Sequence, residues 1–219
     1  MTRKEIRYKG KDVTISYNPD RCIHVGECVR GLGQVFDNGK EPWIQPDNAT
    51  VEDVAEVIRR CPTGALKFTR KDGGEAEKPD AVNRISVSGN GPLYARGRIQ
   101  IHHADGSVLL NETRVAFCRC GATKTPPYCD GSHEQISFSA SGNKPPACPA
   151  SGEGIQHGGT LCITPVENGP LLLEGPVSIH AVDGECIFQG AKVALCRCGA
   201  SAMKPFCDGA HARIGFKSK

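Results

Sequence analysis

The sequence predicts an α+β protein in which a small N-terminal domain precedes two similar, β-rich repeats. The first observation is an internal duplication: residues 90–138 align without a gap onto residues 168–216, 78 positions later, and 23 of the 49 aligned positions are identical. The second is the alternation of apolar and polar residues, which indicates short strands. We therefore expect domains at 1–70, 81–140 and 155–219, joined by linkers without periodicity.

The N-terminal domain reads as a hairpin, a helix and a further strand. Residues 6–17 alternate around a glycine turn, as hairpins do. Thr50 followed by Asp53 is typical of a capped helix start, and Cys61–Pro62 is expected to end that helix. The helix carries an apolar stripe of Val51, Val54, Ala55 and Ile58. A short strand is expected over 64–69.

Each repeat reads as strand, Asp-Gly turn and strand, and both begin with Asn-Gly-Pro-Leu. Neither repeat contains enough apolar residues for a core of its own. We therefore expect the two repeats to pack against each other as an intrachain pseudo-dimer, which would leave the chain a monomer.

Composition limits the function classes. The 219 residues include 12 cysteines, only 5% aromatics and a net charge of +3, which is too weak to indicate nucleic acid as a partner. No run of 18 apolar residues and no apolar leader occur, so we expect no membrane span, no secretory signal and a cytoplasmic location. Because disulfides do not persist in a reducing compartment, this many cysteines indicates metal or redox centres.

The strongest motif is repeated. CRCGATKTPPYCDGSH and CRCGASAMKPFCDGAH both have the spacing Cys-x-Cys-x8-Cys-x3-His. Thiolates and imidazole bind zinc or iron–sulfur clusters, and zinc modules usually have a wider first pair, Cys-x2-4-Cys. A pair of structural zinc sites stays open as the alternative. Asp130 and Asp208 are expected to cap the helix that follows the third cysteine.

The motif, including its Ser/Thr and Pro positions, resembles the CDGSH iron–sulfur (NEET) family over about residues 85–219. The resemblance implies one [2Fe–2S] cluster per repeat, with Cys118 and Cys120 on one iron and Cys129 and His133 on the other. The equivalent residues of the second repeat are Cys196, Cys198, Cys207 and His211. Familiar members are homodimers with one motif and a membrane anchor, whereas this chain is similar to a soluble type with two motifs.

The histidine ligand has a chemical consequence. An imidazole ligand raises the reduction potential above that of an all-cysteine cluster, and it binds only when its nitrogen is unprotonated. We therefore expect acid to weaken both sites, and a Cys replacement at His133 or His211 to lower the potential and reduce that lability.

A different cysteine set lies in the N-terminal domain. Cys22 and Cys28 have the separation of the outer cysteines in a bacterial ferredoxin motif, and Cys61 precedes a proline as the remote ligand does. The middle position is Val25, beside His24. This domain resembles the divergent single-cluster ferredoxins and the three-cysteine ferredoxins. Three cysteines suit [3Fe–4S], or [4Fe–4S] if His24 or an exogenous group binds the fourth iron; an empty or zinc-filled site is the alternative.

Three further cysteines have no partner at ligand spacing. Cys162 and Cys186 lie in strand-like runs and are expected in the core, and Cys148 is expected as an exposed thiol in a Pro-rich linker.

No nucleotide-binding loop or nucleophile motif occurs, so we expect no enzyme activity. The leading hypothesis is electron transfer among three iron–sulfur centres and a redox partner protein. The alternatives are a cluster donor or storage protein, with an apo iron–sulfur protein as acceptor, and a redox or pH sensor that acts through partner binding. Neither nucleic acid nor a membrane is expected as a partner.

Overall fold

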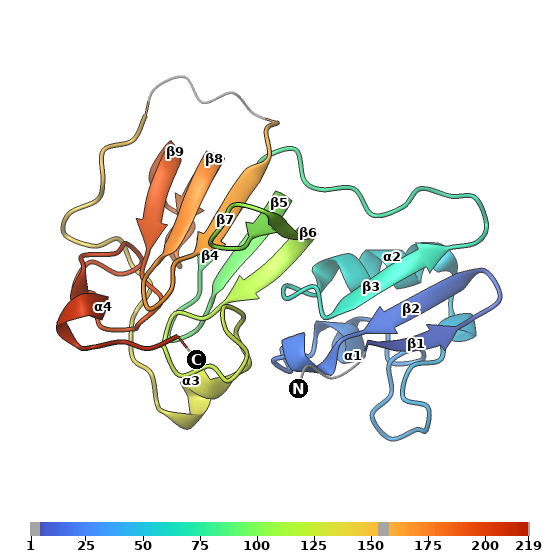
Figure 1. Cartoon of the computed structure of the whole chain (residues 1–219). Helices are drawn as coiled ribbons and strands as arrows, with labels where there is room; N and C mark the ends of the chain where they lie inside the picture. The colour runs from blue at the N-terminus through green and yellow to red at the C-terminus, as the bar shows by residue number, and fades with distance from the viewer. Residues whose placement is uncertain (1–4, 153–157, 219) are drawn as a thin grey trace. The chain divides into compact units, whose positions relative to one another are not determined.

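The computed structural model describes residues 5–152 and 158–218 (Figure 1). The chain divides into two compact units, which we call unit 1 (Met1–Lys78) and unit 2 (Pro79–Lys219). In the described part of the chain, no helix has both the length and the apolar character needed to span a bilayer.

Unit 1 is a three-stranded antiparallel sheet with helices, an α+β arrangement (Figure 1). The strands are β1 (Ile6–Lys9), β2 (Val13–Tyr17) and β3 (Leu66–Arg70), in the order β1-β2-β3. The helices are η1 (Pro19–Arg21), α1 (Glu27–Gly31), η2 (Pro46–Asn48) and α2 (Val51–Arg60). The apolar sides of β2, β3 and α2 meet in one core.

The sequence predictions for these elements are confirmed. Strands β1 and β2 form the hairpin, and β3 pairs with β2. The Thr50 hydroxyl accepts a hydrogen bond from the Asp53 N–H at 3.2 Å, and α2 ends immediately before Cys61. Of the predicted stripe, Val54, Ala55 and Ile58 are fully buried, and Val51 is half-buried. The helix thus places Cys61 at the edge of the core.

Unit 2 repeats one set of elements. The first repeat contains β4 (Arg84–Val87), β5 (Leu93–His102), β6 (Val108–Phe117) and α3 (Ser132–Gln135). The second contains β7 (Leu161–Pro165), β8 (Leu171–His180), β9 (Cys186–Leu195) and α4 (Ala210–Arg213). Apart from one extra residue at the start of β7, each element recurs 78 positions later.

The first strand of each repeat pairs with both repeats. Strand β4 pairs antiparallel with β5 of its own repeat and parallel with β8 of the other. Strand β7 pairs antiparallel with β8 and parallel with β5. The result is one six-stranded sheet in which β4 and β7 join the β5–β6 hairpin to the β8–β9 hairpin. Side chains from both repeats form a single core.

Gly97 allows close backbone approach to Asn83, whose buried side chain connects the two repeats. Gly97 has φ +131°, and a Cβ there would lie 2.8 Å from the Asn83 Cα. The Asn83 amide donates to the carbonyls of Gly159 and Pro176, both at 2.9 Å, and its oxygen accepts from the Arg98 N–H at 2.8 Å. One side chain therefore fastens segments of both repeats.

The predictions for the three unpaired cysteines need correction. Cys186 is exposed, because it begins an outer strand of the sheet, and Cys162 is half-buried. Cys148 is half-buried against the core of unit 2 instead of exposed. The reason is that its linker lies against β9, where the Gly152 N–H donates to the Gln189 carbonyl at 2.8 Å.

Candidate iron–sulfur sites

In each repeat of unit 2 the four predicted ligands are grouped two and two. The sulfurs of Cys118 and Cys120 are 3.6 Å apart, and the Cys129 sulfur lies 3.4 Å from Nδ1 of His133. The second repeat has the same arrangement. There, Cys196 and Cys198 are 3.7 Å apart, and Cys207 lies 3.4 Å from Nδ1 of His211.

These distances fit two ligands on one tetrahedral metal. With metal–sulfur bonds of about 2.3 Å, two sulfurs on one ion lie roughly 3.7 Å apart, and a sulfur and an imidazole nitrogen slightly less. Among residues 5–152 and 158–218, no three His, Cys, Asp or Glu side chains converge on a single point. The three thiols and one imidazole of each repeat, arranged as two close pairs, are donors that would fit an iron–sulfur cluster.

Backbone pairing brings the two ligand pairs together. The Cys118 N–H donates to the Pro127 carbonyl at 3.0 Å, and the Cys129 N–H donates to the Ala116 carbonyl at 2.9 Å. The end of β6 is thus bonded to the segment that carries the third cysteine. The corresponding bonds of Cys196 and Cys207 are 2.8 and 2.9 Å.

The hydroxyl in the motif closes the loop between the second and third cysteines. The Thr123 hydroxyl donates to the Tyr128 carbonyl at 2.7 Å and accepts from the Thr125 N–H at 3.1 Å. Ser201 makes the equivalent bonds in the second repeat, at 2.7 and 3.0 Å. The Ser/Thr position of the motif is therefore explained by loop closure.

The aspartates after the third cysteines were predicted to cap the following helices, but the N-cap residues are Gly131 and Gly209, and each aspartate lies one position earlier and bonds to the first N–H of the helix. Asp130 accepts from the Ser132 N–H at 3.0 Å and, with its other oxygen, from the Lys124 N–H at 2.7 Å. Asp208 makes the same pair of bonds, to Ala210 and Ala202. Each carboxylate thus also fastens the ligand loop to its helix. Although burial opposes its charge, these N–H groups lower the pKa of Asp130.

Burial raises the pKa of two metal-free cysteines, that of Cys129 to about 12 and that of Cys196 to about 11. Cys118 differs, because a hydrogen bond from the Cys120 thiol lowers its pKa to about 6. Since thiolates are the metal ligands, metal binding must release protons here.

The ligand loops of the two repeats touch. Gly121 has φ +81°, and a Cβ there would lie 2.7 Å from the Cys198 carbonyl oxygen. Gly199 has φ +80°, and its Cβ would lie 2.6 Å from the Cys120 carbonyl oxygen. A glycine is needed at both positions, because each loop passes directly over the second cysteine of the other.

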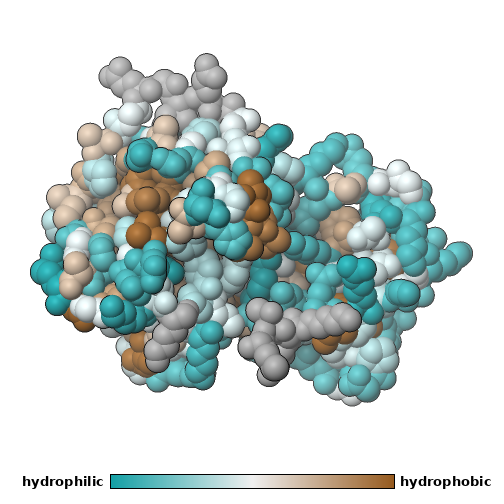
Figure 2. All heavy atoms as spheres, in the orientation of Figure 1, coloured by the Kyte–Doolittle hydropathy of each residue, from teal (hydrophilic) through white to brown (hydrophobic). Residues whose placement is uncertain are grey.

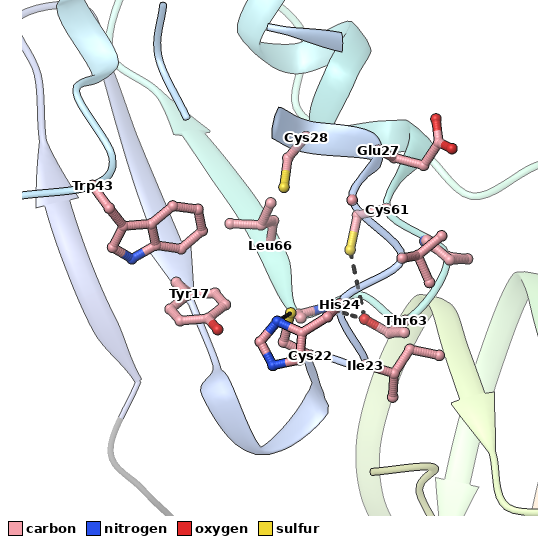
Figure 3. Close-up of a pocket in the computed structure, with 14 residues that line it drawn as sticks. Tyr17, Cys22, Ile23, His24, Glu27, Cys28, Trp43, Cys61, Thr63 and Leu66 are labelled. Atoms are coloured by element: carbon pink, nitrogen blue, oxygen red, sulfur yellow. Dashed lines mark hydrogen bonds between the residues drawn. The ribbon is translucent and has the colours of Figure 1, made fainter. Parts of the chain in front are cut away.

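The predicted ligands of unit 1 surround one pocket (Figure 3). Cys22 follows η1, Cys28 lies in α1 and Cys61 follows α2, so three separate elements bring the cysteines together. All three are half-buried. Three cysteines around one pocket are donors that would fit an iron–sulfur cluster.

His24 lies at the rim of this pocket. Its side chain is exposed, and its Nδ1 is 4.0 Å from the Cys22 sulfur (Figure 3). Its backbone has φ +55°, in the left-handed region that non-glycine residues seldom adopt. The structure thus places His24 beside the first cysteine, without a closer contact.

Sequence reasoning missed the residues that enclose the unit 1 pocket, including Tyr17, Trp43 and Thr63. The Tyr17 and Trp43 rings meet edge to face, with centroids 5.0 Å apart. Burial raises the pKa of Tyr17, and burial raises that of Cys28 to about 11. The alternation of β2, which directs Tyr17 to the side of Val13 and Ile15, is the one signal that pointed to this ring.

Family comparisons match both units. Residues 8–71 match a model described as a divergent 4Fe–4S mono-cluster domain. Residues 90–134 and 168–212 each match a model described as an iron-binding zinc finger of CDGSH type. These ranges contain all the cysteines and histidines discussed above as ligands.

The chain is similar to two relatives named uncharacterized protein YjdI, from Escherichia coli K12 and from E. coli O157:H7. Each is 44% identical to this chain over 64 residues, which are 29% of this chain and 84% of the relative. No solved structure matches the chain. An iron–sulfur-binding region is therefore found in both units, and each repeat of unit 2 supplies one such region.

Proposed function

We propose that this chain, which belongs to the divergent 4Fe–4S mono-cluster family in unit 1 and to the CDGSH iron-binding family in unit 2, is an electron-transfer protein with three centres. Each CDGSH repeat would hold a [2Fe–2S] cluster, and unit 1, with a ferredoxin-like fold, would hold a [3Fe–4S] or [4Fe–4S] cluster. When bound, such clusters accept and release single electrons.

The observation that carries this proposal is the grouping of ligands in pairs. Cys118 with Cys120, and Cys129 with His133, would each hold one iron. A single zinc ion would need all four donors around one point. Residues of the chain hold the ligands in position before a cluster binds. Backbone hydrogen bonds hold the two ligand pairs together, and the Thr123 hydroxyl closes the loop between them.

The pseudo-dimer is part of the proposal. In the pairings of β4 with β8 and of β7 with β5, two of the three residue pairs correspond when the repeats are exchanged at the offset of 78: Arg84–Ser178 corresponds to Cys162–Gln100, and Ile85–Ile179 to Ile163–Ile101. This supports a duplication that takes the place of a second chain. A monomer then suffices to enclose both CDGSH sites.

A second candidate, cluster donation, is favoured by the position of the histidine. His133 is half-buried, as is Cys120, whereas Cys118 and Cys129 are buried. Because an imidazole binds iron more weakly than a thiolate, His133 would offer an acceptor protein the first point of attack. A redox or pH sensor remains a third candidate, with a partner whose binding depends on the state of the sites.

The proposed partners are a redox protein for the carrier and an apo iron–sulfur protein for the donor. We propose the cytoplasm as the location, because all 12 cysteines are free thiols. We propose no enzyme activity of its own, and neither nucleic acid nor a membrane as a partner.

Repeated reduction and reoxidation under anaerobic conditions tests the carrier against the donor. The carrier retains its iron and its visible spectrum through many cycles, even with excess apo-ferredoxin present. Loss of iron to the apo-ferredoxin in step with the appearance of its own cluster spectrum would favour donation instead. A partner that binds only one redox state, without electron or iron exchange, would favour the sensor.

A further inference from the structure

Each CDGSH motif carries a buried arginine between its first two cysteines. Arg119 is 1% exposed and Arg197 is 4% exposed, which makes them two of the few buried cations of the described structure. An unpaired charge in such a position is costly, so a buried guanidinium requires hydrogen bonds and a counter-charge.

The hydrogen bonds go to neutral groups. Arg119 donates through Nε to the Gly91 carbonyl at 2.9 Å and through Nη2 to the carbonyls of Ser88 and Ala140, at 2.5 and 3.1 Å. Its guanidinium lies 5.3 Å from the centroid of the Phe138 ring. Its Nη1 is buried and has no partner among the described residues. These hydrogen bonds therefore hold the Arg119 guanidinium in place but do not neutralise its positive charge.

Arg197 repeats this arrangement in the second motif. It donates to the carbonyls of Gly169 and Val166, at 3.0 and 2.5 Å, and lies 5.6 Å from the centroid of the Phe216 ring. Within residues 5–152 and 158–218, the ion pairs of Asp and Glu side chains involve other cations, and neither of these two arginines is among them.

The counter-charges lie in the ligand sets, and partly in the opposite repeat. Burial lowers the pKa of Arg119 to about 10, and the sulfurs of Cys196 and Cys120 oppose this effect. Burial also lowers the pKa of Arg197, and the Cys118 sulfur opposes it. Each guanidinium therefore lies close enough to the first cysteine of the other motif to interact with its charge when that cysteine is a thiolate.

For Arg197, the geometry gives the same connection between the two repeats. The two ligand loops touch where Gly121 meets Cys198 and where Gly199 meets Cys120. Arg197 lines a cavity together with the loop of the first motif, which contributes Gly121, Ala122, Thr123 and Pro126. The second repeat's arginine thus faces the first repeat's ligand loop.

We infer that Arg119 and Arg197 are cross-repeat positioning residues, each holding a positive charge beside the iron–sulfur site of the other repeat and making that site easier to reduce. A site with three thiolates and a neutral imidazole is anionic, and it becomes more so on reduction. A fixed positive charge in a buried place then favours the reduced state. The inference rests on the proposed [2Fe–2S] clusters.

The test requires a protein that holds one CDGSH cluster. The double variant Cys207→Ala, His211→Ala removes one ligand pair of the second repeat and leaves site 1, which consists of Cys118, Cys120, Cys129 and His133. Its potential is measured by anaerobic titration of the full chain, followed by the visible spectrum of site 1. Arg197→Gln is then added to this variant. Arg197 binds no metal and lies in the second repeat, so any change in the potential of site 1 comes from the other repeat.

The matched control is Lys124→Gln, which removes the same charge from an exposed side chain within the site 1 loop itself. Water and salt screen that charge. We expect Arg197→Gln to lower the ratio of reduced to oxidised site 1 at fixed potential by about tenfold or more. Lys124→Gln should change it less than about twofold. Arg197→Lys, which keeps the charge, should restore most of the ratio.

Three results would overturn the inference: equal effects of Arg197→Gln and Lys124→Gln, no rescue by Arg197→Lys, or loss of iron from site 1 that the lysine does not reverse. The last two results would indicate that the Arg197 guanidinium only supports the ligand loop. If Arg197→Gln loses iron from site 1 and Arg197→Lys retains it, the positive charge is needed at site 1, which supports the inference. In the reverse experiment, site 1 is removed and Arg119→Gln is tested on site 2, which consists of Cys196, Cys198, Cys207 and His211. Arg119→Gln must again lower the ratio of reduced to oxidised cluster more than an exposed control does. A parent without a [2Fe–2S] spectrum would instead refute the proposed function.

Discussion

At the scale of single residues, the glycine after the second cysteine decides whether the two ligand loops fit together. We predict that Gly121→Ala lowers the iron content and destabilises unit 2 by more than about 2 kcal/mol, because the new Cβ meets the Cys198 carbonyl. Gly106→Ala is the matched control. It has a similar φ of +84° but no atom within 4 Å, so it should cost only about 1 kcal/mol and leave the iron content unchanged. Equal iron loss in both would contradict the contact.

Asn83 gives a second residue-scale prediction. Its three hydrogen bonds connect both repeats, and its side chain is buried. Asn83→Ala leaves these backbone groups without partners, so we expect it to lower the free energy of unfolding by about 3 kcal/mol in urea titrations. Asn143→Ala, at an exposed position of the same unit, should have almost no effect. A loss below about 1 kcal/mol for Asn83→Ala would show that water replaces these bonds.

At this scale the sequence indicates ligands better than it indicates their surroundings. Cys118 and His133 could be identified because thiolate and imidazole at fixed spacing are specific to metal sites. Arg119 and Asn83 could not, because an arginine or asparagine in a sequence gives no sign that it is buried. Their roles depend on carbonyls from distant segments, such as Ser88 and Pro176.

At the scale of elements, the duplicated hairpins are covered differently. Ile187 and Phe188 on β9 are 4% and 3% exposed, whereas the equivalent Leu109 and Leu110 on β6 are 47% and 37% exposed. The linker around Gly152 bonds to β9. In Figure 2, apolar areas interrupt a largely hydrophilic surface.

This asymmetry predicts unequal mutational costs at equivalent positions. Ile187→Ala should lower the free energy of unfolding by about 2–4 kcal/mol, because it leaves a cavity in a closed core. Leu109→Ala should lower it by less than about 1 kcal/mol, since the side chain is already in contact with water. Chemical denaturation of the two variants checks this, and equal costs would mean that β6 is covered in solution.

The elements with clear periodicity were predictable. The hairpins of both units and helix α2 follow from alternation, turn residues and the Thr50 cap. Strands β4 and β7 were not predicted. They are short, and their parallel partners lie in the other repeat, about 60 to 95 positions away, which local patterns cannot reveal.

At the scale of the whole molecule, each unit has its own core and its own ligand set. The connecting segment around Glu75 is exposed and contains neither helix nor strand. We predict that a protease specific for glutamate cleaves first at Glu75, and that both fragments keep their iron after separation. Iron loss from either fragment would show that its site needs the other unit.

The central claim is that the paired ligands hold clusters and not single zinc ions. The most direct measurement is a count of iron, acid-labile sulfide and zinc in anaerobically purified protein, with its visible and EPR spectra. We expect two [2Fe–2S] centres and a third, distinct cluster from unit 1, with little zinc. A colourless protein with zinc at both CDGSH motifs and no sulfide would contradict it.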